Sequence, residues 1–206
     1  YTLAPNCIIP ADVFSGTTPL GPLVSDPNML AGGSVIHLAN NDTILGFRFD
    51  ASNAANTVFG NGVSNALPIT NVNLTDNTFT DYVVGANLQN VSGDVIIDNN
   101  QFLGTAGTAT HGLNLTLNGN ANVLVRDNVA TNNSTAGLRI IAQTGSTVNA
   151  DDPNGTGGTA SGIINNVANN NGTGIQTQAN SGATFNAVVS GNIAGGNTAD
   201  GFDRVK

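Results

Sequence analysis

One spacing of apolar and polar residues recurs five times between Val72 and Ala194. The copies are Val72-x-Leu74-x-x-Asn77-x-Phe79, Val95-x-Ile97-x-x-Asn100-x-Phe102, Val123-x-Val125-x-x-Asn128-x-Ala130, Ser161-x-Ile163-x-x-Asn166-x-Ala168 and Ala187-x-Val189-x-x-Asn192-x-Ala194. Alternation with a period of two is typical of β-strands. Each unit is too short to bury its own apolar face. The repeat therefore predicts a solenoid whose successive coils stack.

A second short run, opened by glycine, follows each of these motifs. The runs are Gly85-Ala86-Asn87-Leu88, Gly112-Leu113-Asn114-Leu115, Gly137-Leu138-Arg139-Ile140, Gly174-Ile175-Gln176-Thr177 and Gly201-Phe202-Asp203. Glycine tolerates the positive φ that a sharp corner requires, and we expect that conformation here. Two strands and a short third would form one coil. The predicted fold class is all-β, a parallel β-helix of about six coils.

The composition divides the chain into two parts. Residues 1–30 contain five of the seven prolines and predict an irregular N-terminal cap, because proline removes a strand hydrogen-bond donor. Residues 31–206 are predicted to form the β-helix, with an inserted loop near 144–159, where the repeat gains about a dozen residues. The segment from Ile44 to Phe49 matches the repeat if Phe47 takes the position of the asparagine.

The alignment assigns each column of residues to one side of the wall, because strand side chains alternate. The asparagine column, from Asn77 to Asn192, is predicted to be a structural ladder that satisfies backbone groups at a bend. The phenylalanine column changes to alanine after Phe102, so the core should narrow unless another column compensates. Asp98 and Arg126 share a column in adjacent coils and should form a surface ion pair.

Two outward columns are candidate functional surfaces. The first is a stripe of polar side chains suited to hydrogen bonds with sugar hydroxyls: Asn87, Asn114, Arg139, Gln176 and Asp203. The second is an apolar surface that a neighbouring segment or chain should cover: Ile96, Leu124, Val188, Val129, Val167 and Ile193. We expect the cover to be the inserted loop, the N-terminal segment or another chain.

Charge and composition restrict the partners. Charged residues are 9% of the chain and its net charge is −8, which argues against nucleic acid. We expect no direct membrane insertion, because no apolar run approaches 18 residues. A Gly- and Asn-rich composition also fits a disordered chain, but the periodic apolar residues argue against disorder. The single cysteine, Cys7, excludes an internal disulfide and fits a bacterial surface protein as well as a cytosolic one.

With an inward asparagine at the turn and Phe or Ala two residues later, residues 34–206 resemble the right-handed parallel β-helix of the pectin-lyase-like superfamily. The run from Ser34 through Phe49 is similar to the early coils of bacterial autotransporter-passenger proteins of the polymorphic outer-membrane type. The resemblance implies an extracellular or cell-surface location. It implies a fold more strongly than a function, since the superfamily contains lyases, hydrolases, adhesins and phage tailspikes.

The superfamily resemblance also directs attention to catalytic residues. His111-Gly112 and Arg139-Ile140 occur in the order found in polygalacturonase-like members, but Ile141 replaces the expected lysine and the acidic pair Asp151-Asp152 follows both. If the chain is an enzyme, Arg139, His111 and Asp151 are the candidates. We expect no required cofactor and no metal. Asp151, Asp152 and Asn154 are weak candidates for Ca²⁺, which takes six to eight oxygen ligands.

The sequence favours a non-catalytic surface protein for adhesion, structural reach or assembly, with other protein chains or surface glycans as partners. The alternative is a polysaccharide-degrading lyase or glycoside hydrolase. An ice- or mineral-binding face would require a Thr-x-Thr array, toward which only Thr173 and Thr177 contribute. The last run ends without a polar cap, so we expect either continuation into a longer chain or filament, or self-association through that end.

Overall fold

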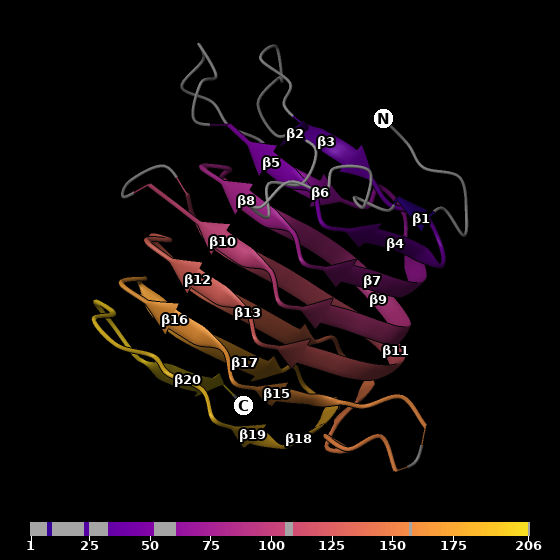
Figure 1. The fold of residues 1–206 in the computed structure, drawn as a ribbon. Helices are drawn as coiled ribbons and strands as arrows, with labels where there is room; N and C mark the ends of the chain where they lie inside the picture. The colour runs from indigo at the N-terminus through magenta and orange to yellow at the C-terminus, as the bar shows by residue number, and fades with distance from the viewer. Residues whose placement is uncertain are drawn as a thin grey trace.

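The computed structural model describes residues Ile8–Ile9, Leu23–Val24, 33–51, 61–105, 109–156 and 158–205. This part of the chain contains β-strands and turns without a helix. The strands pair in parallel and stack as a β-solenoid of about six turns (Figure 1). The predicted all-β fold and its parallel coils are therefore confirmed.

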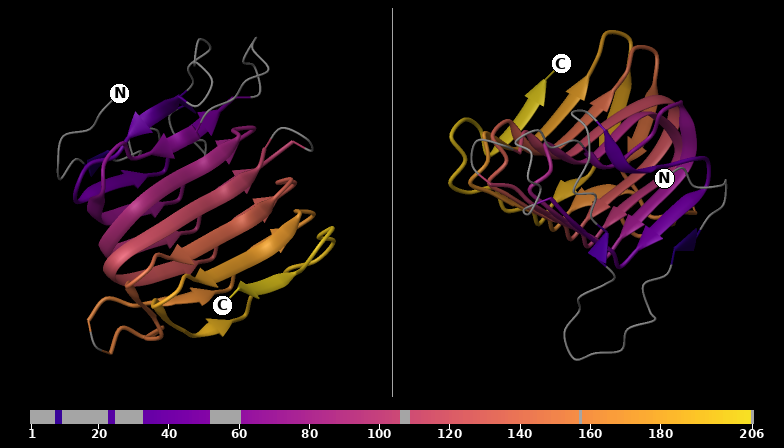
Figure 2. Two further views of the ribbon diagram at one scale, coloured as in Figure 1. Left: turned by 180° about the vertical axis from the view of Figure 1, so that it is seen from behind. Right: turned by 90° about the horizontal axis from the view of Figure 1, so that it is seen from above.

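The wall of the solenoid consists of a 14-stranded sheet that bends around the coil and a separate six-stranded sheet. The large sheet begins along one side with β3 (Ser34–His37), β6 (Asn61–Ser64), the first parts of β9 (Val84–Asp98) and β11 (His111–Arg126), β13 (Ala136–Ala142), β17 (Thr173–Ala179) and β20 (Phe202–Val205). We call the outward surface of these strands the polar face. β9 and β11 then bend and continue into the second side, which Figure 2 shows from two further directions.

The second side of the large sheet contains β1 (Ile8–Ile9), β4 (Asp42–Leu45), β7 (Ile69–Thr75), the later parts of β9 and β11, β15 (Gly162–Ile164) and β19 (Val189–Ser190). Between the two sides lie β14 (Thr147–Ala150) and β18 (Thr184–Ala187). The six-stranded sheet contains β2 (Leu23–Val24), β5 (Arg48–Asp50), β8 (Thr78–Thr80), β10 (Gln101–Leu103), β12 (Val129–Thr131) and β16 (Val167–Asn169).

Two strands lie within the segment expected to form the N-terminal cap. β1 pairs in parallel with β4, and β2 pairs in parallel with β5, so both extend the stack by one rung. The remainder of residues 1–30 lies outside the described residues. At the insertion, the first half of the predicted loop differs from the expectation, because β14 pairs with β11 and β18. Among the described residues, those that leave the wall are 151–156 and 158–161, and from here on we use the name inserted loop for these residues.

The strand register matches the sequence alignment of the coils. Val95 lies opposite Val72 and Val123, and Arg126 lies opposite Asp98. The Arg126 Nε lies 3.1 Å from the Asp98 Oδ1 and 3.4 Å from the Asp127 Oδ2, so the predicted ion pair is confirmed and includes a second carboxylate. Hydrogen bonding to Asp98, together with both negative charges, raises the pKa of Arg126.

The asparagine ladder closes the corner between the second side and the six-stranded sheet. The Asn100 Nδ2 donates to the Leu74 carbonyl of the preceding coil at 2.8 Å and to the Asn128 Oδ1 of the following coil at 3.0 Å. The Asn100 Oδ1 accepts from the backbone N–H and the Nδ2 of Asn77, each at 3.0 Å. The same pattern joins the whole column: Asn77, Asn100, Asn128, Asn166 and Asn192.

The first coil confirms the predicted position of Phe47. Its backbone N–H donates to the Asn77 Oδ1 at 2.9 Å, as the N–H of a ladder asparagine does. Directly before each ladder position the backbone has a positive φ, at Gly46, Asp76, Asn99, Asp127, Asn165 and Gly191. Asparagine, aspartate and glycine tolerate this left-handed conformation better than other residues, which explains the composition of that column.

The core is filled in two ways along the stack. Phe49, Phe79 and Phe102 are buried and stack face to face, with ring centroids 4.8 and 5.2 Å apart. From Ala130 onward the column of phenylalanines is replaced by alanine. In these later coils a second asparagine ladder fills the space that the rings occupy in the earlier coils. Its members also hydrogen-bond along the stack and to the preceding coil: Asn133, Asn171 and Asn197. Another column therefore compensates for the lost rings.

Glycine is required at the start of the second strands for a different reason from the one expected. Positive φ is absent at Gly85, Gly112 and Gly137, so the conformational explanation is wrong there. A Cβ at Gly112 would lie 2.6 Å from the Phe102 Cβ, and one at Gly137 would lie 2.7 Å from the Asn171 Nδ2. These glycines leave space for the side chains that fill the core.

Replacing Asn100 by alanine should destabilise the fold strongly. The Asn77 N–H and the Leu74 carbonyl would each lose a buried partner, at about 1–3 kcal/mol per group, so the free energy of unfolding should fall by about 2–6 kcal/mol. Urea denaturation measures the change. Asn99→Gly is the control, since glycine tolerates the φ of 52° at that exposed position. Equal losses in the two variants would refute the structural role of the ladder.

Phe102→Ala should cost about 3–5 kcal/mol, because it removes a buried ring from the middle of the core. Leu103→Ala, one residue later on the outward side of β10, is the matched control and should cost much less. Thermal and urea unfolding of both variants checks this. A Phe102 loss no larger than that of Leu103 would show that the ring does not support the core.

Candidate functional site

The polar face carries a continuous column of polar side chains at one register position. Asn87 lies opposite Asn114, Asn114 opposite Arg139, Arg139 opposite Gln176, and Gln176 opposite Asp203. All five predicted ligand-binding residues thus lie in one column of half-buried side chains. The register extends the same column to two residues that the sequence interpretation did not include, Ser64 and His37.

Hydrogen bonds connect most of this column. The Asn114 Nδ2 donates to the Asn87 Oδ1 at 2.9 Å, and the Arg139 Nη1 donates to the Asn114 Oδ1 at 3.1 Å. The Arg139 Nε donates to the Gln176 Oε1 at 3.0 Å, and the Gln176 Nε2 donates to the Asp203 Oδ2 at 3.0 Å. Some of the hydrogen-bonding groups of this column are therefore already used in bonds between adjacent coils.

A similar contact lies at the N-terminal end of the column. The Ser64 Oγ and the His37 Nδ1 are 3.2 Å apart, and the Ser64 Oγ lies 2.7 Å from the Ser34 Oγ. The early coils lack the asparagine motif, so the alignment gave no reason to place His37 and Ser64 on the polar face. Only the pairing of β3 with β6, and of β6 with β9, reveals their position.

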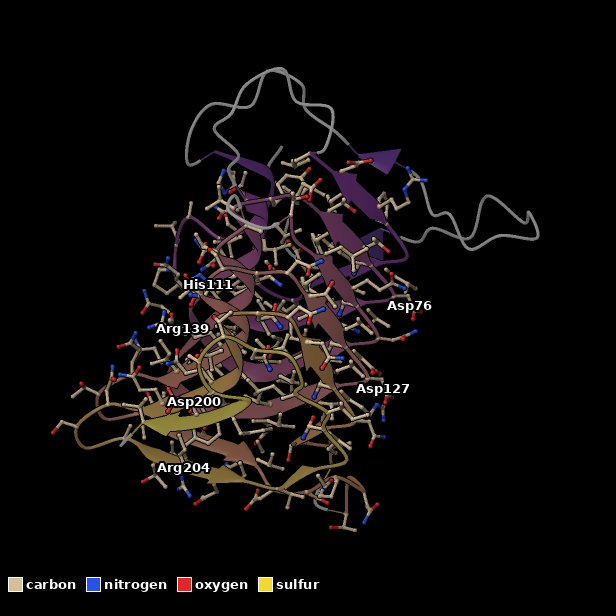
Figure 3. All side chains as sticks on the ribbon, turned by 90° about the vertical axis from the view of Figure 1, so that its left-hand side faces the viewer. Asp76, His111, Asp127, Arg139, Asp200 and Arg204 are labelled. Carbon is tan, nitrogen blue, oxygen red and sulfur yellow. The ribbon has the colours of Figure 1, made fainter. Side chains whose placement is uncertain are left out.

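His111 and Arg139 lie close together on the polar face, as Figure 3 shows. His111 starts β11 opposite Ala136, and its Nδ1 lies 3.2 Å from the Thr110 Oγ1. Burial, and secondarily the charge of Arg139, lowers the pKa of His111 from its usual 6.5 to about 4. Burial also lowers the pKa of Arg139. The pair therefore consists of a neutral imidazole and a guanidinium at neutral pH.

Asp151, the third residue of the catalytic hypothesis, belongs to a different part of the coil. It is exposed and follows β14 at the start of the inserted loop. Within the described residues, no hydrogen bond or ion pair joins it to His111 or Arg139. The structure thus brings together His111 and Arg139, whereas Asp151 lies in a different part of the coil.

The weak Ca²⁺ candidates have structural contacts in the inserted loop. Asp152 closes the base of the loop: its backbone N–H donates to the Ser161 Oγ at 3.0 Å, and its Oδ1 accepts from the Thr156 hydroxyl at 3.0 Å. Asn154 is exposed. Over the described ranges, no group of three or more His, Cys, Asp or Glu side chains is placed to hold a metal ion.

The apolar candidate interface divides into two columns on either side of the ladder corner. Ile96 and Leu124 are opposite one another on the second side, and Leu124 is only 4% exposed in the single chain. The inserted loop reaches this side, where the Thr159 hydroxyl lies 3.4 Å from the Asp94 Oδ2. Val188 continues the same side and is half-buried.

The other apolar column lies on the six-stranded sheet. Val129 pairs with Val167, and Val167 forms a bridge to Ile193. Val129 and Val167 are half-buried, whereas Ile193 in the last coil is 59% exposed. Exposure of the candidate interface is therefore concentrated toward the C-terminal end of the stack.

No family model, curated protein or solved structure matches this chain. No helix in the described ranges is long and apolar enough to cross a membrane. The protein class is therefore defined by the fold alone: a parallel β-solenoid of about six turns, braced by two asparagine ladders.

Acid should destabilise the protein partly through His111. Its folded pKa of about 4 lies below the usual 6.5, so the unfolded chain binds the proton first. The stability that the neutral imidazole contributes is present above pH 6.5 and is lost as the pH falls toward 4. His111→Gln should reduce the loss of unfolding free energy between pH 7 and pH 4.5, measured by urea denaturation. His37→Gln controls for removing a histidine from this face. Identical pH profiles for wild type and His111→Gln would contradict the assignment.

Proposed function

We propose that this chain is a non-catalytic extracellular or bacterial cell-surface β-helical protein that serves adhesion, structural reach or assembly. The observation that carries the proposal is the hydrogen-bonded column from Asn87 to Asp203. Its side chains run along the stack and bond to one another instead of converging on one point. Such a column presents a polar side chain at each coil, which suits contact with an extended partner.

The dimensions of the solenoid support a role in reach. Parallel rungs are spaced about 4.8 Å apart, so six coils extend a surface by roughly 30 Å. The two ladders and the stacked rings make each coil depend on its neighbours, as in other solenoids. Adhesion through the polar face would use the amide groups that remain accessible, with surface glycans or protein chains as partners.

The second candidate is a polysaccharide-degrading enzyme of the pectin-lyase-like type. The observation that favours it is the proximity of Arg139 and His111, whose pKa is lowered to about 4. Histidine is a common general base, and a neutral imidazole can accept a proton. In this reading Arg139 would stabilise negative charge on the substrate.

A panel of neutral and acidic polysaccharides separates the two functions. Release of reducing ends and of unsaturated uronates should stay at background level, while binding to immobilised glycans or proteins should be measurable. Asn87→Ala should weaken that binding about two- to tenfold, the equivalent of the ~0.5–1.5 kcal/mol of one hydrogen bond.

The matched control for the binding arm is Gln101→Ala, which removes an amide from the outward side of the six-stranded sheet. It should leave binding unchanged. Robust turnover that Arg139→Ala abolishes would overturn the proposal in favour of the enzyme.

A further inference from the structure

The inserted loop contains the peptide bond between Asp152 and Pro153, which differs chemically from its neighbours. Figure 1 shows this loop, in orange, leaving the wall beside β15. The nitrogen of proline carries no hydrogen, so the bond is a tertiary amide. The aspartate side chain can attack its own backbone carbonyl carbon, because the attack closes an unstrained succinic anhydride ring. A carboxylate nucleophile and a susceptible amide are therefore adjacent in the chain.

Two backbone donors converge on the carbonyl oxygen of this peptide bond. The N–H of Ser161 donates to the Asp152 carbonyl oxygen at 2.8 Å, and the N–H of Gly155 donates to the same oxygen at 3.1 Å. Donors in this arrangement stabilise the negative charge that develops on a carbonyl oxygen when a nucleophile attacks its carbon, as in an oxyanion hole. The fold of the loop therefore polarises the carbonyl group of the Asp152–Pro153 bond.

Further contacts hold Asp152 in position. Its backbone N–H donates to the Ser161 Oγ at 3.0 Å, and its Oδ1 accepts from the Thr156 hydroxyl at 3.0 Å. Ser161 is 3% exposed, so the residue that contacts Asp152 through both its N–H and its hydroxyl is fixed at the wall of the solenoid. The carboxyl group and the carbonyl are both restrained, which lowers the entropic cost of bringing them together.

We propose that the chain cleaves its own Asp152–Pro153 bond. The carboxyl oxygen of Asp152 bonds to the Asp152 carbonyl carbon, and the carbon–nitrogen bond to Pro153 breaks. The carboxyl proton goes to the Pro153 nitrogen, which leaves as a secondary amine. Water then opens the cyclic anhydride and restores the side-chain carboxyl group. The net reaction is hydrolysis of a peptide bond, and mild acid favours it because the reacting side chain is protonated.

Cleavage leaves the solenoid assembled, because the strands on both sides of the bond pair with the same neighbour. β14 precedes the bond and β15 follows it, and both pair with β11. The inserted loop, whose Thr159 hydroxyl lies 3.4 Å from the Asp94 Oδ2, is then attached at one end only. This self-processing activity is additional to the proposed function and does not depend on the polar face.

The chain contains its own matched control, because Asp26-Pro27-Asn28 repeats the sequence of Asp152-Pro153-Asn154. The folded 206-residue chain is incubated at about pH 5, and intact mass spectrometry compares cleavage of the two bonds in one sample. The Asp152–Pro153 bond should break about tenfold or more faster, since the two N–H donors act on it. In concentrated urea the two rates should become equal. The Asp26–Pro27 bond lies outside the described residues, so the urea sample supplies the intrinsic rate of both.

Variants and a chemical trap identify the reaction. Asp152→Glu should slow cleavage, because attack then closes the larger glutaric anhydride ring, and Pro153→Ala should slow it by restoring an ordinary peptide bond. Asp151→Asn is the matched control, since it removes the neighbouring exposed carboxylate, and should leave the rate unchanged. Hydroxylamine should convert Asp152 into a hydroxamate by trapping the anhydride, which cleavage by a contaminating protease would not produce.

Equal cleavage of the two Asp–Pro bonds in the folded chain would overturn the proposal. Cleavage at an unchanged rate in Asp152→Glu, fragments without the hydroxamate, or the absence of fragments would overturn it as well. Binding of glycans or proteins by the polar face is measured separately, so failure of the proposed function and failure of self-cleavage are distinguishable.

Discussion

Each coil of this solenoid must turn a corner inside the protein, where backbone N–H and C=O groups lose the partners that a straight strand provides. An unpaired buried group costs about 1–3 kcal/mol, and the cost would recur in every coil. The Asn100 carboxamide meets this constraint in both directions, with a donor for the Leu74 carbonyl and an acceptor for the Asn77 N–H. Stacking of the coils, and hence the regular columns on every face, depends on this interaction.

The core shows how a second ladder can replace apolar volume. In the early coils the interior is filled by stacked rings, and the glycines of the facing strand leave space for them. After Ala130 the ring is absent, and Asn171 takes the space beside Gly137 while bonding to the Ala130 carbonyl. A polar amide is stable in that interior because both of its groups have partners along the stack.

Much of this arrangement could be predicted from the repeat. A period of two fixes which side chains point inward, so Asp98 could be paired with Arg126 and the polar column could be drawn without coordinates. The second ladder could not, because its asparagines occur only in the later coils and resemble turn residues. The role of Gly112 could not be predicted either. Glycine can be required for a positive φ or for close packing against a side chain, and the sequence does not distinguish the two.

The same repetition explains why the scaffold is easier to infer than its role. Many polar side chains hydrogen-bond to the adjacent coil and so stabilise the stack. On the polar face, for example, Arg139 bonds to Gln176 and to Asn114. The most direct test of the account is the hydrogen exchange of the side-chain amides, followed by NMR. The Nδ2 protons of Asn100 and Asn128 should exchange with the protection of the core strands, whereas those of exposed Asn118 should exchange rapidly. Equally rapid exchange at all three positions would contradict the claim that the asparagine ladder holds the coils together.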